Sequence, residues 1–253
     1  IENKNLKVDL ITFDYSKNKK IIFKNIITPI MDLKLIEILN INNDFEIQAS
    51  GKFLNLTYFR KKIENDEINI TNKFKIDLTA QKIILDPSIS ISGNLQGIKK
   101  GGSFEAIALG EMSIREAPIL ESGKLKILIN NNFSKIESIG LTGGAETKII
   151  FYKNKNQFPT ITFDTIDGGK LLSALSFTNK VRGGKMNIKL KFLDNSYSHY
   201  EGQIKASNFS LIDMPGIINS LSILSFSGLE SVLIGEGVTF NFGEAEIYVK
   251  EDV

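Results

Sequence analysis

The chain has 253 residues, of which 42% are hydrophobic and 24% are charged, so it is long enough for one large or two ordinary globular domains and is not a disordered polymer. A formal net charge of +2 gives no basis for a nucleic-acid partner. The absence of cysteine excludes disulfides, zinc–thiolate sites and a thiol nucleophile.

Alternation of apolar and polar residues predicts strands along most of the chain. Met186, Ile188, Leu190 and Phe192 give the clearest case, because lysines or asparagine stand between them. This pattern is typical of half-buried strands in an antiparallel sheet with one wet face. In chain order, the alternating segments are residues 6–10, 45–50, 74–80, 125–129, 185–192, 238–242 and 245–249.

Helical signals are few and short. Thr28 and Pro29 form a good N-cap and first-turn pair, which predicts a helix over residues 30–39. Asp167 and Asp213 are expected to cap two further helices. The remaining expected helical segments are residues 56–63, 168–177, 215–224 and 228–234.

About a dozen amphipathic strands present more apolar surface than about four short helices can cover. A sheet face has to be buried by a second sheet, by helices, by a partner or by a ligand. Closing the sheet predicts a sandwich or barrel, and curling it without closing predicts an apolar groove. The alternation pattern alone leaves these outcomes open.

Residues that could carry chemistry are sparse. His199, the single histidine, lies in a polar turn without neighbours spaced as metal ligands or as a catalytic triad, so we expect a solvated loop residue. Residues 99–102 (KKGG) and 181–185 (VRGGK) lack the spacing of a phosphate-binding loop. Capping explains Asp167 and Asp213 better than acid–base catalysis. We therefore expect no enzyme, no metal site and no cofactor.

Two C-terminal stretches, residues 164–191 and 202–242, each run from a strand through an Asp-initiated helical segment and glycines into another strand. Within them, residues 167–172 read DGGKLL, residues 182–184 read RGG and residues 235–240 read GEGVTF. In order and spacing, these motifs resemble the C-terminal region of the AsmA-like family, in its YhdP-type branch, whose relatives include TamB. The best match covers residues 164–242.

This resemblance implies an elongated, curved, open β-sheet that is mostly antiparallel, forms an apolar groove and carries a few short helices. It implies non-catalytic transfer of phospholipids between inner and outer membrane in support of outer-membrane biogenesis. The protein would lie in the periplasm, anchored in the inner membrane by a segment outside this chain. The chain begins at Ile1 rather than Met, so residues 1–253 are expected to be a single AsmA-like fragment of a longer protein.

The expected partners are phospholipid acyl chains and, through other parts of the protein, the two membranes. The alternative hypothesis is a structural or adhesive envelope β-domain with a packed core and no ligand. Residues 215–234 are too interrupted by serines, Gly228 and Glu230 for a membrane span, and they could cover one end of the groove. The candidate groove residues are Ile76, Leu78, Ile127, Ile129, Ile188, Leu190, Phe192, Leu221, Leu224, Phe240 and Phe242.

Overall fold

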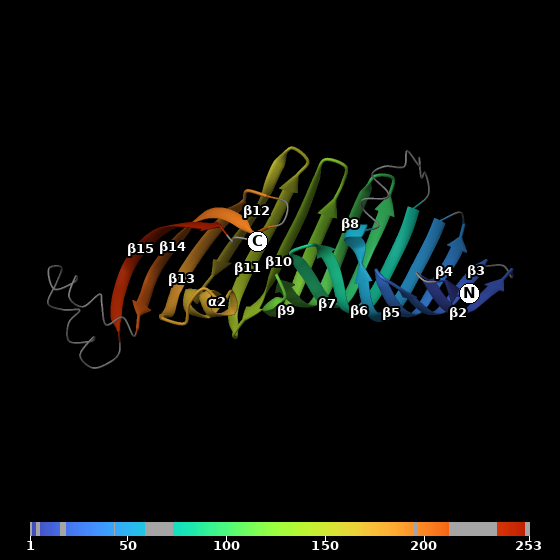
Figure 1. Cartoon of the computed structure of the whole chain (residues 1–253), viewed down its shortest axis with the longest axis horizontal. Coiled ribbons are helices and arrows are strands. Elements are labelled where there is room, and N and C mark those ends of the chain that lie inside the picture. The colour runs from blue at the N-terminus through green and yellow to red at the C-terminus, as the bar shows by residue number, and fades with distance from the viewer. Residues whose placement is uncertain are drawn as a thin grey trace. The chain divides into compact units, whose positions relative to one another are not determined.

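The computed structural model describes residues 2–3, 6–15, 19–42, 44–58, 73–194, 197–212 and 237–250. In this part of the chain it is an all-β protein with an open, curved sheet, as the sequence predicts (Figure 1). The strands follow one another across the sheet in chain order. They are β1 (Glu2–Asn3), β2 (Leu6–Asp14), β3 (Lys20–Thr28), β4 (Met31–Ile41), β5 (Asp44–Asn55), β6 (Lys73–Asp86), β7 (Ile89–Lys100), β8 (Ser103–Ile114), β9 (Ala117–Ile129), β10 (Phe133–Thr142), β11 (Ala145–Asn154), β12 (Gln157–Thr165), β13 (Val181–Phe192), β14 (His199–Leu211) and β15 (Val238–Lys250).

Strand pairing is mostly antiparallel. The pairs from β1 to β8 and from β12 to β15 are antiparallel, except that β5 and β6 run parallel. A parallel pair needs a crossover connection, and residues 56–58 at its start are helical. Asn55 caps this turn, because its Oδ1 accepts from the backbone N–H of Thr57 at 3.0 Å. The rest of the helix expected over residues 56–63 lies outside the described residues.

Two compact units make up the chain. The first comprises Ile1–Pro118, Ser122–Ser138 and Lys153–Asn156, and the second comprises Ile119–Glu121, Ile139–Tyr152 and Gln157–Val253. The first unit buries apolar residues of β6 to β9, among them Ile83, Leu95 and Met112. The second buries Phe151, Phe163 and Ile188.

The helix expected over residues 30–39 is wrong, because these residues form most of β4. Thr28 and Pro29 initiate a tight turn instead: Thr28 pairs directly with Met31, and the Ile30 N–H donates to Thr28 Oγ1 at 3.2 Å. Proline favours the first inner position of such a turn as much as the first turn of a helix. Apolar residues on both faces of β4 hide its period of two.

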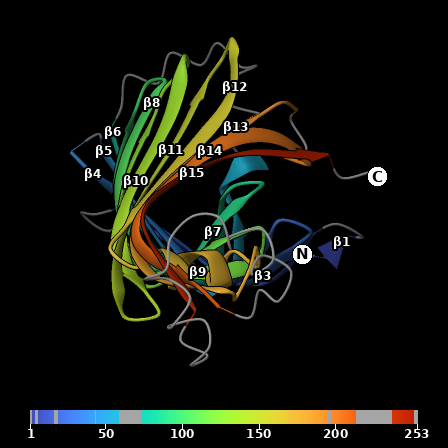
Figure 2. The same cartoon turned by 90° about the vertical axis from the view of Figure 1, so that its left-hand side faces the viewer.

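Helix α2 (Gly168–Ala174) confirms the helix predicted after Asp167. The Asp167 carboxylate accepts from the Lys170 backbone N–H at 3.2 Å, as an N-cap does. Leu171 and Leu172 are buried. A Cβ on Gly168 would lie 2.5 Å from Met186 Cε, so α2 packs closely on the Met186 face of β13. Figure 2 shows α2 on the concave side of the bent strands β13 to β15. The helices expected in residues 215–234, and the Asp213 cap, lie outside the described residues.

Candidate functional site

The register of the first unit places four isoleucines side by side on one face of the sheet. Ile21 on β3 pairs with Ile38 on β4, which pairs with Ile47 on β5, which pairs with Ile76 on β6. We call these four residues the isoleucine row. Each is half-buried, so water reaches part of each side chain.

Next to the isoleucine row, apolar side chains on the same face are buried. Leu78 and Leu95 pair across β6 and β7 and are 6% and 0% exposed. Leu95 pairs in turn with Ala108 on β8, which is also 0% exposed. Water, and therefore a ligand, reaches the isoleucine row but not Leu78, Leu95 or Ala108. In the first unit, the isoleucine row therefore offers a set of adjacent, accessible apolar side chains.

Aromatic residues and one lysine form the next row toward the strand ends. Phe45 pairs with Phe74, Phe74 with Lys99, and Lys99 with Phe104. We call these four residues the rim row. The rings of Phe45 and Phe74 stack with centroids 5.0 Å apart. Lys99 is half-buried, and its burial lowers the pKa of its ammonium group.

In the second unit, the face expected to line a groove is largely dry. Phe163 pairs with Ile188, and Ile161 pairs with Leu190; all four are at most 5% exposed. Phe192 is also buried, with its ring edge-on to Tyr197 at 4.8 Å. Farther along these rows, Ile204 on β14 and Ile247 on β15 are half-buried. Among the described residues of these rows, the partly exposed apolar side chains therefore lie toward β15.

The candidate groove residues thus fall into different environments. Ile76 and Ile129 are half-buried. Leu221 and Leu224 lie outside the described residues. Phe240 is half-buried and stacks on Phe209 with centroids 5.3 Å apart. The fully or nearly fully buried candidates are Leu78, Ile127, Ile188, Leu190 and Phe192.

Phe242 requires a correction. Ala245 shares the face of Ile188, because both pair with Ile204. Phe242 is three positions from Ala245 on an unbroken ladder, so alternation places it on the opposite face. Phe242 is 63% exposed and lies on the face opposite Ile188, which we call the outer face. Alternation within 238–242 could not reveal this, because Gly243 interrupts the pattern before Ala245.

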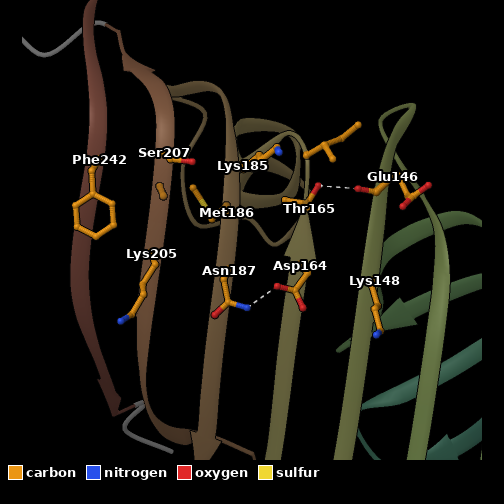
Figure 3. A pocket seen from close by; sticks show the side chains of 12 residues that line it. Glu146, Lys148, Asp164, Thr165, Lys185, Met186, Asn187, Lys205, Ser207 and Phe242 are labelled. Atoms are coloured by element: carbon orange, nitrogen blue, oxygen red, sulfur yellow. Dashed lines mark hydrogen bonds between the residues drawn. The ribbon is translucent and has the colours of Figure 1, made fainter.

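The outer face of the second unit has a hollow of about 500 Å³ beside Phe242. Lys148, Asp164, Asn187 and Lys205 project from neighbouring strands along it (Figure 3). Asn187 Nδ2 donates to Asp164 Oδ1 at 2.5 Å, and Lys205 forms an ion pair with Glu244 at 3.3 Å. The lining residues include no histidine or cysteine, so the hollow holds no nucleophile paired with an imidazole base.

His199, expected as a solvated loop residue, instead begins β14 and is half-buried. Its Nδ1 lies 2.5 Å from Asp194 Oδ2 and 3.1 Å from Ser198 Oγ. The Asp194 carboxylate also accepts from Ser198 Oγ at 2.8 Å and from the backbone N–H groups of Ser198 and His199. In a Ser–His–Asp triad, serine and aspartate contact different ring nitrogens. Here both contact Nδ1, so the arrangement stabilises the turn between β13 and β14 and lacks the triad geometry.

Sequence reasoning missed most of the isoleucine row. Ile38 lies in the segment assigned to a helix, and Ile21 lies in a run of apolar residues without alternation. Ile47 stands in an alternating segment, but nothing local distinguishes it from the apolar residues of other strands. A signal exists only in the register, which brings residues 21, 38, 47 and 76 into one row.

The described ranges also bear on metal binding and on membrane spanning. Within them, no three or more histidine, cysteine, aspartate or glutamate side chains are grouped so that they could hold a metal ion. In the same ranges, no helix has the length and apolar character that crossing a membrane requires.

Comparisons of the chain with family models, with curated proteins and with solved structures found no match. The resemblance to the AsmA-like family therefore rests on the sequence motifs alone.

Proposed function

We propose that this chain binds phospholipid acyl chains along the isoleucine row, without catalysis. We further propose that it is part of an AsmA-like protein, anchored in the inner membrane, that transfers phospholipids through the periplasm toward the outer membrane. The observation that carries the proposal is a continuous row of half-buried isoleucines on the apolar face of an open sheet.

Binding of this kind needs little polar recognition. Removing a methylene group from water stabilises a complex by about 0.8 kcal/mol, so burying five of them contributes about 4 kcal/mol. The same contact covers side chains of the isoleucine row that water now reaches. Because the row crosses four strands spaced about 4.8 Å apart, an acyl chain can lie across it over roughly 14 Å.

A packed β-domain without a ligand is the second candidate function, and the burial pattern of the second unit favours it there. Ile188 is 0% exposed and Leu190 is 5% exposed, so an acyl chain could reach them only if neighbouring side chains moved. The two candidates therefore make different predictions for lipid contact. Groove binding predicts contact at the isoleucine row, and a packed domain predicts no contact anywhere.

Photocrosslinking in intact bacteria tests this directly. A benzophenone amino acid replaces Ile47 in one variant and Gln48 in the control, which is exposed on the opposite face of the same strand. We expect phospholipid capture from position 47 and little from position 48. Native mass spectrometry of the purified chain should show co-purified phospholipid. Equal capture from both positions, or capture from position 48 alone, would contradict the assignment of the face.

A further inference from the structure

Lys99 occupies an unusual place for a lysine, because it lies on the apolar face. Gly97, two residues earlier on β7, pairs with Ile76 of the isoleucine row. Residues two apart on a strand share a face and lie about 7 Å apart. Lys99 is therefore one step outside the isoleucine row, toward the end of β7.

Aromatic rings flank Lys99 on both neighbouring strands. Phe74 pairs with it on β6 and Phe104 pairs with it on β8. A Cβ on Gly97 would lie 3.0 Å from Phe104 Cε2, so the Phe104 ring leans over the space that the glycine leaves. Lys99 thus lies between aromatic neighbours on the apolar face, and its half-buried side chain is partly open to water.

The charge of Lys99 has no compensating carboxylate among the described residues. Desolvation alone shifts its pKa, and it shifts it downward. Lysines on nearby strands differ: Lys20 contacts Glu37 at 3.0 Å, and Lys75 contacts Glu46 at 3.1 Å. Hydrogen bonds from Gln48 and Lys75 lower the pKa of Glu46, which keeps the Lys75 partner ionised. Of Lys20, Lys75 and Lys99, only Lys99 lies half-buried on the apolar face without a carboxylate partner among the described residues.

We propose that Lys99 binds the phosphate of a phospholipid whose acyl chain lies on the isoleucine row. This inference rests on the proposed function and adds a head-group site to it. Lys99 is a partly desolvated cation, and the isoleucine row lies about 7 Å farther along the same face. A ligand that fits both therefore has an anionic group next to an apolar chain. A phosphate oxygen accepts from the ammonium and restores the favourable interactions that burial removes. The glycerol unit spans the step between the two rows.

The test measures binding of acyl-labelled phosphatidylglycerol and of diacylglycerol with the same chains. The proteins are the wild-type chain, Lys99→Met, Lys99→Arg and the control Lys100→Met, whose lysine is the exposed neighbour. We expect Lys99→Met to weaken phosphatidylglycerol binding about tenfold and to leave diacylglycerol binding unchanged. Lys99→Arg should retain most of the affinity, and Lys100→Met should match the wild type.

The outcomes separate this inference from the proposed function. If the wild type binds neither probe, the proposed function is overturned and the head-group site with it. If Lys99→Met binds both probes as the wild type does, the acyl site stands and the role of Lys99 is overturned. A third labelled probe, a free fatty acid, identifies the anion. If the wild type prefers it to phosphatidylglycerol and Lys99→Met abolishes that preference, Lys99 recognises a carboxylate and the phosphate assignment is wrong.

Discussion

Replacing Gly110 with alanine should strongly destabilise the protein. Gly110 on β8 pairs with Gly93 on β7, and the two backbones approach closely there. A Cβ on Gly110 would lie 1.9 Å from the Ser92 carbonyl oxygen and 3.1 Å from Gly93 Cα. The Gly110 φ of +154° is a value that side chains disfavour. Gly110→Ala should therefore lower the free energy of unfolding by about 3–4 kcal/mol, because the added Cβ pushes the strands apart and strains φ.

Gly101→Ala is the matched control in the same hairpin. Gly101 also has a positive φ, +54°, but a Cβ there would meet nothing within 4 Å. Its substitution should cost only the backbone strain, about 1–2 kcal/mol. The difference between the two variants, about 2 kcal/mol, therefore reports the steric clash together with any extra strain of the Gly110 φ of +154°.

Urea denaturation followed by far-ultraviolet circular dichroism measures both variants. The strand signal suits a chain that has no tryptophan. If Gly110→Ala loses no more stability than Gly101→Ala, the two strands separate without cost. The close approach of β7 and β8 would then not be a constraint on the fold.

Three further predictions concern caps, turns and titration. Asp167→Ala should lower the free energy of unfolding by about 1 kcal/mol through loss of the α2 cap, whereas Asp167→Asn should retain most of it; equal melting temperatures for Asp167→Ala and the wild type would argue against the cap. Asp194→Ala should cost about 1–3 kcal/mol because it leaves several hydrogen-bond donors without their acceptor. His199→Ala should cost less than about 1 kcal/mol, since it removes only the ring contacts and the His199 and Asp194 side chains are 28% and 27% exposed; the reverse order of the two variants in a thermal melt would contradict the assigned roles. Burial lowers the folded-state pKa of Lys99, so between that value and 10.5 the unfolded chain binds more protons than the folded chain. The wild type should therefore gain stability relative to Lys99→Met as the pH rises through this window, and a constant difference in urea midpoints would show that Lys99 is not desolvated.

Local patterns predicted much of the fold because their physical causes are local. The alternation in β13 identified the buried residues Met186, Ile188, Leu190 and Phe192. Asp167 before two glycines and an apolar run predicted α2 and its cap. Each prediction depends on residues within one strand or one helical turn, so neighbouring residues decide it.

Competing local signals explain the wrong helix over residues 30–39. Thr28 and Pro29 suit the start of a helix and a tight turn equally well. Most residues of the following segment are apolar, so neither period stands out. The segment forms a strand because it pairs with β3 on one side and β5 on the other. This pairing satisfies its backbone hydrogen bonds and places its apolar side chains against neighbours on both faces.

The sequence by itself determined that this chain is built of amphipathic strands with few helices, because side-chain alternation and capping are local properties. Only the tertiary structure decided which apolar residues remain accessible. Ile76 and Ile188 read alike in the sequence, yet one is half-buried and the other is 0% exposed. Likewise, Lys99 acquires its aromatic neighbours only through register with β6 and β8. Alternation within one strand gives its two faces but not its register with the next strand, which depends on the connecting turns and, for the parallel pair β5–β6, on a longer connection.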